Sequence, residues 1–282
     1  MLIDLETMKK IHDIQLEMMN ELIRVMEKLN IKYYFVHGSL LGAITQENFI
    51  QEDDDIDIAI FREDYNRLLK YGNDYLSDIY FIQSSLNDDF PLSFAKMRNS
   101  RTAFIQPILD KYKCNKGIYI DIFPIDYTSK NKFLRFKEKL LSIRINSRLS
   151  YTEKLSFKKF IIKGISLAFF PSYCKAKEVR EAMYSKRLAS NFVGLTNGKV
   201  SEQNIPLEWF GEGIIKQFSG IDVTCPLMYN EYLTKVYGIN YHDINPAEDR
   251  VSSDKLVEIS AKILDFEKSY KEYEEQDLHT FD

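Results

Sequence analysis

Hydrophobic positions recur at helical spacing near the start of the chain and alternate in several short runs further on. Residues 5–29 carry an apolar stripe at intervals of three and four, which predicts an amphipathic helix. The stripe consists of Ile11, Ile14, Met18, Leu22, Met26 and Leu29. The β-branched and aromatic run "IKYYFV" (31–36) predicts a strand. After it, "SLLGAI" predicts a helix with Ser39 near the N-cap.

Two later runs alternate between isoleucine and other residues, namely "IDIAIF" (56–61) and "GIYIDIFPID" (117–126). This period of two predicts half-buried strands. Pro124 is expected to close the second strand, because proline cannot donate to a central ladder. Further strands are predicted at 80–83 and 92–97 and helices at 64–72 and 226–238, with mostly helical structure through 130–190 and the last thirty residues.

Composition narrows the class of protein. An apolar content of 45% and a charged content of 28% are typical of soluble globular chains. Cys114, Cys174 and Cys225 are far apart and form no CxxC pair, which indicates a reducing compartment and argues against structural zinc. The first residues lack the apolar core of a signal peptide, and the run at 160–170 is too short to cross a bilayer. We therefore expect a cytoplasmic location.

Positive charge is concentrated in residues 130–163, which carry eleven Lys or Arg and two Glu although the whole chain has a net charge of −4. Cations mixed with Phe, Leu and Ile are typical of helices lying on an anionic bilayer. We expect this segment to make peripheral contact with the inner face of the cytoplasmic membrane. The alternative is a solvated helical pair that balances the acidic remainder. Nucleic acid is not expected as a partner, because no recognised binding module is present.

An acidic cluster, "DDDID" at 53–57, stands at the start of the first alternating run. Alternate residues of a strand share a face, so Asp55 and Asp57 project together while the isoleucines between and after them bury the other face. Asp121 has the same setting in the second run. If the two strands are neighbours, these three carboxylates converge on one or two Mg²⁺ (or Mn²⁺) ions.

The alternatives for this cluster are a solvated loop and a structural calcium site. Carboxylates beside buried isoleucines are costly without a compensating cation, which favours a metal site over a solvated loop. The ligand order of an EF-hand is absent from the sequence.

Gly38 and Ser39 follow a predicted strand and open a predicted helix. Such a junction directs backbone N–H groups and a helix dipole at an anion, although alone it could be a tight turn. Together with the D-h-D and h-D-h patterns further on, it is typical of chemistry on a nucleotide phosphate.

The order hGS…DhD…hDh resembles the nucleotidyltransferase superfamily. "GSLLGAITQENFIQEDDDIDI" with "IDIFPID" resembles its LicD branch, which includes phosphorylcholine transferases and fukutin-related ribitol-phosphate transferases. The likeness extends through "FAKMRNSRTAF" (94–104), "PLEWF" (206–210) and "CPLMYNEYLTKVYGINYHDINPAEDR" (225–250). It implies an α/β (α+β) fold, a nucleotidyltransferase-like mixed sheet with flanking helices. Its expected parts are a catalytic core at 1–127, a basic helical insertion at 128–200, and a C-terminal segment at 201–282 that packs back on the core.

The resemblance also implies an activity. It is the metal-dependent transfer of a substituted phosphate, phosphorylcholine first among the candidates, from a CDP-linked donor such as CDP-choline. The acceptor would be a hydroxyl of a cell-surface glycan, such as teichoic acid or lipopolysaccharide, or its lipid-linked precursor, and CMP would be released. Asp55 and Asp57 would hold the metal, Asp121 would be a third ligand or the base, and Gly38 and Ser39 would approach the donor phosphates.

One departure from the LicD pattern concerns the donor. Thr45 stands where the family usually has Arg, so donor identity stays open. Lys96, Arg98 and Arg101 are candidates to replace that phosphate contact, the alternative for each being a surface cation. Two other functions stay open: a nucleotidyltransferase that attaches a nucleoside monophosphate from an NTP, and a non-catalytic glycan-binding protein on the same fold.

Overall fold

The computed structural model describes residues 1–128, 189–195, 203–244 and 256–278, together with Val251 and scattered positions between 131 and 183. Most of the basic segment 130–163 therefore lies outside the described residues, and its predicted helices and membrane contact stay predictions. The division into three parts at residues 127 and 200 likewise stays a prediction.

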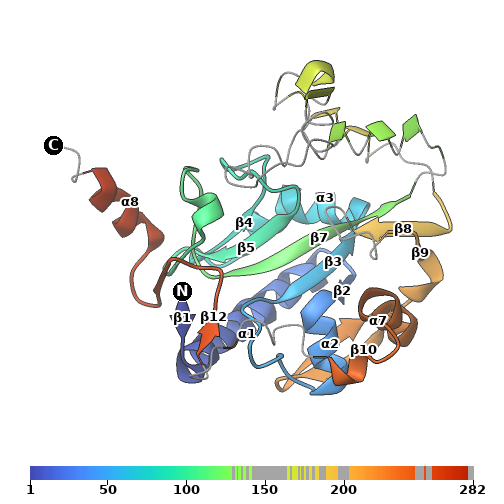
Figure 1. Cartoon of the computed structure of the whole chain (residues 1–282), viewed down its shortest axis with the longest axis horizontal. Coiled ribbons are helices and arrows are strands. Elements are labelled where there is room, and N and C mark those ends of the chain that lie inside the picture. Colours follow the sequence, from blue (N-terminus) through green and yellow to red (C-terminus); the bar gives the residue numbers. More distant parts are fainter. Residues whose placement is uncertain are drawn as a thin grey trace.

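A seven-stranded mixed sheet forms the centre of the chain (Figure 1). Five strands follow the order β2-β3-β7-β5-β4, and β8 and β9 extend the sheet from the end of β7. The pair β3–β7 is parallel and the other pairings are antiparallel, which confirms the predicted mixed α/β architecture. The strands are β2 (Tyr33–Phe35), β3 (Asp57–Phe61), β4 (Tyr80–Gln83), β5 (Ala95–Asn99), β7 (Tyr119–Tyr127), β8 (Phe192–Leu195) and β9 (Ile205–Pro206).

The isoleucine alternation of the sequence is the core pattern of β3 and β7. Every second residue is fully buried on the face opposite the acidic side chains, and these residues are Ile56, Ile58, Ile60, Ile118, Ile120 and Ile122. Asp57 lies opposite Asp121 in the register of the two strands. The predicted neighbourhood of the two alternating runs is confirmed.

The prediction that Pro124 ends its strand is wrong, because β7 continues through it. The Asp121 N–H donates to the Ile56 carbonyl on the β3 side, so by alternation Pro124 turns its nitrogen to the other side. On that side β5 ends its pairing at Ile122 and β8 begins its own at Ile125. A proline is tolerated there because the partner strand changes at this point and no ladder N–H is needed.

Helices α1 (Leu5–Lys28), α2 (His37–Thr45), α3 (Arg62–Tyr71) and α7 (Tyr229–Tyr237) pack around the sheet. Helix α1 contacts β5 and β7 through its apolar stripe, as Figure 1 shows behind the sheet. Its first turn is capped by the Asp4 carboxylate, which accepts from the Thr7 N–H. Helix α2 begins at His37 with Val36 as N-cap, so the expectation of Ser39 near the N-cap is wrong. The described part of the chain also contains the short 3₁₀ turns η1 (Gly72–Asp74), η2 (Pro107–Leu109), η4 (Leu207–Trp209) and η5 (Tyr241–Asp243).

The C-terminal residues return to the N-terminal part of the chain. After the hairpin β10 (Ile214–Phe218) and β11 (Ile221–Cys225), β12 (Val257–Glu258) pairs with β1 (Leu2–Ile3), and β13 (Ile263–Asp265) pairs with β6 (Ala103–Ile105). Only then does helix α8 (Tyr270–Leu278) begin. The prediction of helical structure through the last thirty residues is wrong for β12 and β13. These residues form strands because they pair with strands that are distant in the sequence.

The chain leaves the sheet after β7 and returns to it at β8. The two ends of this excursion meet, since the Thr128 N–H donates to the Phe192 carbonyl at 2.9 Å. Within the described residues, no helix has the length and apolar character needed to span a membrane.

Candidate active site

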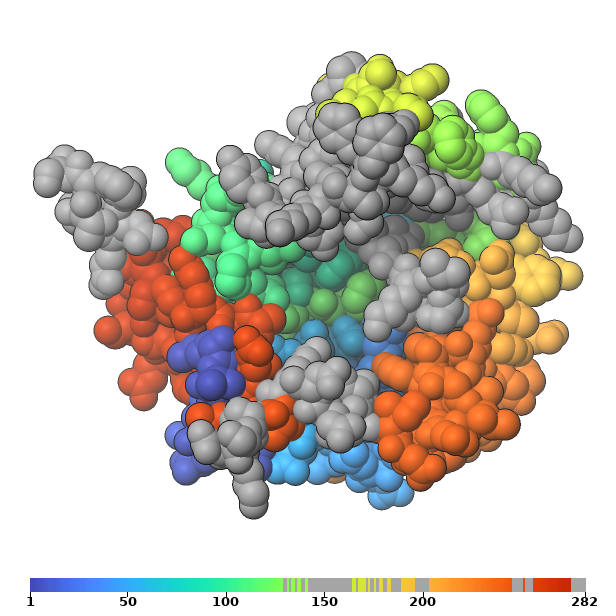
Figure 2. Space-filling view, in the orientation of Figure 1, coloured from blue at the N-terminus to red at the C-terminus, as the bar shows by residue number. Residues whose placement is uncertain are grey.

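Three carboxylates converge at the start of β3 and near the start of β7. Asp55, Asp57 and Asp121 each offer an oxygen, and these oxygens lie within 4.8 Å of one another. The parallel pairing sets Asp57 opposite Asp121, so both side chains leave the sheet on one face, and Asp55 joins them from two residues upstream. Figure 2 shows blue and green atoms of this part of the sheet still visible between the red C-terminal segment and the orange residues beyond 203.

The negative charge of the cluster is only partly compensated by neighbouring groups, as the raised pKa values of Asp55 and Asp121 indicate. Asp57 and Asp121 are 8% and 6% exposed, and Asp55 is half-buried. Burial raises the pKa of Asp121 to about 6, although Lys96 acts in the opposite direction. Burial, followed by the charge of Asp57, raises the pKa of Asp55 well above its usual range. Oxygen donors that repel one another in this way fit a hard divalent cation such as Mg²⁺ or Mn²⁺.

Lys96 brings a positive charge into the cluster from β5. It lies opposite Asp121 in the strand register, and its Nζ is 2.5 Å from Asp121 Oδ1. The ammonium also lies 3.3 Å from the centre of the Tyr119 ring. Burial lowers the pKa of Lys96. The structure thus sets this predicted phosphate-binding lysine beside a carboxylate of the cluster.

Arg98, the second of the three predicted phosphate-binding cations, lies two residues further along β5. It is fully buried, and its guanidinium donates to Gln83 Oε1 and to the Gly117 carbonyl, both at 2.8 Å. Burial lowers the pKa of Arg98. These hydrogen bonds engage Arg98 within the protein, and its contact with a donor phosphate stays a prediction.

The predicted Gly38-Ser39 junction forms the first turn of α2. This turn lies against the acidic loop, residues 53–56, which precedes β3. A Cβ at position 38 would lie 2.1 Å from Asp53 Oδ2, so a glycine is needed for this approach. The Ser39 hydroxyl is buried and accepts from the Asp57 N–H at 2.8 Å. The positive end of the α2 dipole therefore lies next to the carboxylates, where a phosphate is also stabilised.

An aromatic wall formed by His37, Phe94 and Phe123 borders the cluster. His37 has a φ of 51°, and its Nδ1 lies 3.4 Å from Asp57 Oδ2. Its ring meets Phe123 edge-on at 4.9 Å, and Phe94 lies 4.5 Å from Phe123 between ring centres. Phe123 shares its face of β7 with Asp121, so this wall adjoins the carboxylates.

Asp54, Gln15 and Ser260 fix the acidic loop from behind. Gln15 Nε2 donates to the carbonyls of Asp54 and Tyr119 at 2.9 and 3.1 Å. The Asp54 carboxylate is buried and accepts from the Ser260 N–H and hydroxyl at 3.0 and 3.1 Å. The sequence did carry a signal for Gln15, a polar residue on the apolar stripe of α1 four positions after Ile11.

Comparison with known families decides the relationship. The model of the LicD/FKTN/FKRP nucleotidyltransferase domain matches residues 30–170, which is 141 of the 282 residues. The chain belongs to the LicD family. The LicD match spans the acidic loop, the first turn of α2 and the strands β3, β5 and β7, so every part of the site described above except Gln15 and Ser260 lies within it.

A relative from Haemophilus influenzae agrees with the LicD assignment, and two others share a short stretch of sequence. The lipopolysaccharide cholinephosphotransferase LicD of Haemophilus influenzae is 25% identical over 236 residues, which cover 79% of this chain and 87% of the relative. Uncharacterised proteins of Rickettsia prowazekii and Rickettsia typhi are each 42% identical over 48 residues, covering 17% of this chain and 18% and 16% of the relatives.

Proposed function

We propose that this protein transfers a substituted phosphate, phosphorylcholine first among the candidates, from a CDP-linked donor to a glycan hydroxyl and releases CMP. The enzyme class follows from the family and from the cholinephosphotransferase relative: the protein is a phosphotransferase. The relative's name adds lipopolysaccharide as the first acceptor to consider. The observation that carries the proposal is the convergence of three carboxylates within 4.8 Å on one face of the sheet.

The carboxylates divide into two roles. Asp55 and Asp57 would hold Mg²⁺ or Mn²⁺, and Asp121 would be a third ligand or the base. A bound divalent ion would supply charge that neutralises the phosphate oxygens. The first turn of α2, with Gly38 and Ser39, would bind the same phosphates through its N–H groups and dipole.

The transfer itself makes one bond and breaks one. The acceptor hydroxyl oxygen bonds to the phosphorus of the substituted phosphate while the bond from that phosphorus to the CMP oxygen breaks, and CMP leaves with the electron pair. If Asp121 is the base, its carboxylate takes the hydroxyl proton. Its pKa of about 6 suits a base that works near neutral pH.

The aromatic wall supports choline among the transferable groups. A trimethylammonium group is attracted to the faces of aromatic rings. Phe94 and Phe123 pack against each other beside the carboxylates, with ring centres 4.5 Å apart, and Phe94 is partly exposed. A polyol phosphate would gain less from these rings, since it has no cationic head.

The proposal is tested by product analysis. The protein is incubated with Mg²⁺, a glycan acceptor and a panel of CDP-choline, CDP-ethanolamine and CDP-ribitol, and CMP is measured by chromatography. CMP release with CDP-choline is the expected result. Pyrophosphate release from an NTP instead would establish the nucleotidyltransferase alternative. Absence of any product together with absence of Mg²⁺ binding in calorimetry would leave the non-catalytic glycan-binding protein.

We also propose a cytoplasmic enzyme that binds anionic membrane through residues 130–163. Among the described positions of this segment, Phe133 and Phe136 are 73% and 53% exposed, as expected for side chains available to a bilayer. Sedimentation with anionic and neutral vesicles at low and high salt tests the idea. Equal binding to both vesicle types, or no effect of reversing Lys154, Lys158, Lys159 and Lys163 to Glu, would disprove it.

A further inference from the structure

A cavity of about 1130 Å³ lies on the molecule outside the carboxylate cluster. Its walls come from the edge strand β4, the loop 110–116, the start of β13 and helix α8. This volume is at the upper end of small-molecule pockets and leaves room for more than one sugar ring. We propose that the cavity binds an anionic saccharide, namely the phosphate- or carboxylate-bearing part of the glycan acceptor, an assignment that rests on the proposed function.

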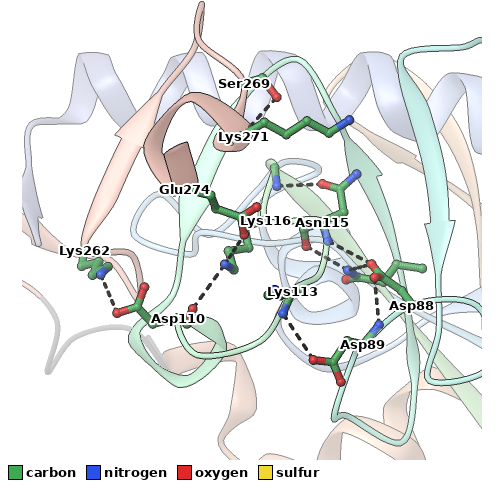
Figure 3. A network of polar contacts seen from close by, with 12 residues as sticks. Asp88, Asp89, Asp110, Lys113, Asn115, Lys116, Lys262, Ser269, Lys271 and Glu274 are labelled. Atoms are coloured by element: carbon green, nitrogen blue, oxygen red, sulfur yellow. Dashed lines mark hydrogen bonds and ion pairs between the residues drawn. The ribbon is translucent and has the colours of Figure 1, made fainter. Parts of the chain in front are cut away.

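Two lysines in the wall are already compensated by the protein. Lys116 is almost fully buried, pairs with Glu274 of α8, and donates to the Asp110 carbonyl at 3.3 Å. Lys262 pairs with the Asp110 carboxylate at 2.6 Å. As Figure 3 shows, these contacts join three separate segments around Asp110. These contacts hold the wall together. Because both lysines are already paired within the protein, a charged ligand must pair with other groups.

A hydrogen-bond network around the Asp88 carboxylate contributes another part of the cavity lining. Asp88 Oδ2 accepts from the Asn115 N–H at 2.9 Å and from Gln83 Nε2 at 2.8 Å. The Asn115 side chain donates to the Ser100 hydroxyl at 2.8 Å. Hydroxyl, amide and carboxylate groups in this arrangement are chemically suited to hydrogen bonds with sugar hydroxyls, which both donate and accept.

Lys113 and Lys271 also line the cavity, and their charges take no part in the ion pairs of the wall. Neither ammonium forms an ion pair with any described residue, and both residues are exposed. In Figure 3 the Lys271 side chain extends past the network without joining it. The rings of Tyr112 and Tyr270 line the same space, and both residues are largely buried in the wall. The lining as a whole has five lysines against the carboxylates of Asp78, Asp88, Asp110 and Glu274, and this small excess of positive charge favours a sugar that carries an anionic group.

The cavity and the carboxylates are connected through two stretches of chain. Lys116 and Asp121 lie five residues apart on the stretch that becomes β7, so their Cα atoms are at most about 18 Å apart. Ser260 binds Asp54 behind the cluster, and Lys262, two residues on, pairs with Asp110 in the cavity wall. These two stretches therefore link the cavity wall to the carboxylate cluster by a few residues each.

Direct binding to the full-length protein tests the inference without requiring turnover. The probes are a deacylated lipopolysaccharide core oligosaccharide that keeps its phosphates and the same oligosaccharide after phosphatase treatment, each titrated in a calorimeter. We expect the phosphorylated probe to bind at least about tenfold more tightly, because charge-assisted hydrogen bonds are lost with the phosphate. Lys271→Glu should weaken the phosphorylated probe by at least about tenfold. The matched control, Lys235→Glu on the exposed side of α7, should change binding less than twofold.

Three results would overturn the inference: equal binding of the two probes, wild-type binding by both Lys271→Glu and Lys113→Glu, or displacement of the probe by CDP-choline that depends on Lys271. CMP release from CDP-choline without acceptor should be the same in the control Lys235→Glu and in wild type, and Asp57→Asn should still bind the oligosaccharide. If no donor yields CMP while binding of the phosphorylated probe still depends on Lys271, the proposed transfer fails and the anionic-saccharide site stands.

Discussion

The two ends of the parallel pair β3–β7 handle charge in opposite ways. At the starting end, Asp57 faces Asp121 and is joined by Asp55, so that three carboxylates crowd together. At the far end, Arg62 follows β3 directly and holds Asp126 of β7 in a bidentate pair, with Nε–Oδ1 and Nη2–Oδ2 distances of 2.8 and 2.7 Å.

The contrast is between an ion pair that is complete within the protein and a carboxylate cluster whose charge is not balanced. The Arg62 fork matches the geometry of the Asp126 carboxylate, and both side chains are largely buried, so the far end is complete within the protein. At the starting end Lys96 reaches Asp121, yet the pKa of Asp121 stays raised because burial outweighs that lysine. The same two strands are therefore neutralised at one end and carry uncompensated negative charge at the other.

Breaking the far end should produce the largest change in stability. Asp126→Ala leaves the Arg62 guanidinium buried without its carboxylate, so the free energy of unfolding should fall by about 3–5 kcal/mol. Urea denaturation followed by circular dichroism measures this. The double variant Arg62→Met, Asp126→Leu should recover most of the loss, since it removes both charges. A loss below about 1 kcal/mol in Asp126→Ala would show that the pair does not stabilise the fold.

Breaking the starting end should instead abolish activity. Asp57→Asn keeps the side-chain shape and removes charge that holds the metal, so CMP release should fall by about 10²–10³-fold. The metal-free variant should be as stable as wild type or more stable, because carboxylate repulsion is relieved. Asp243→Asn, which changes an exposed aspartate of η5, should leave both properties unchanged. Retention of more than about a tenth of the wild-type turnover would remove Asp57 from the metal site.

A smaller effect should appear as a pH dependence confined to the starting end. The pKa of Asp121 is raised from 3.8 to about 6, so the native state keeps a proton that the unfolded state has already lost between these values. Without metal, the Asp121 contribution to stability therefore falls as pH rises from about 4 through 6. Mg²⁺ competes with that proton, so its affinity should rise about tenfold between pH 5 and pH 7.5.

Thermal unfolding with Mg²⁺ and with EDTA at both pH values measures the effect. The Mg²⁺-dependent increase in Tm should be larger at pH 7.5, and Asp121→Asn should reduce this difference. An equal increase at both pH values in the wild type would contradict a titrating carboxylate in the metal site.

The starting end was predictable from sequence because its signal is local. Alternating isoleucines place Asp55, Asp57 and Asp121 on strand faces, and two strands with the same pattern pair naturally. The first helix was equally clear, since its stripe repeats over 24 residues. Long regular patterns of this kind dictate structure from within the segment.

The far end was not predictable, because its partners are decided by tertiary structure. Arg62 and Asp126 lie 64 residues apart, and neither stands in a pattern that marks it. The continuation of β7 through Pro124 depends on where β5 stops and β8 starts. Strands of two or three residues, such as β12 and β13, are too short to show a period. The cavity beside α8 likewise joins segments that only the fold brings together.

The Thr128 N–H donates to the Phe192 carbonyl, so the chain returns to the place where it left the sheet. In the topology of the sheet, the residues between these two positions are therefore an insertion. A loop whose two ends share one hydrogen bond can lengthen or shorten without moving the strands that carry it, and doubling its length costs only about 0.6 kcal/mol in closure entropy. Residues 129–191 can thus diverge, or be exchanged for the corresponding stretch of another LicD-family protein, while the strands bearing the carboxylates keep their register. Chimaeras joined at these two positions would measure what residues 129–191 contribute to binding and activity independently of the sheet.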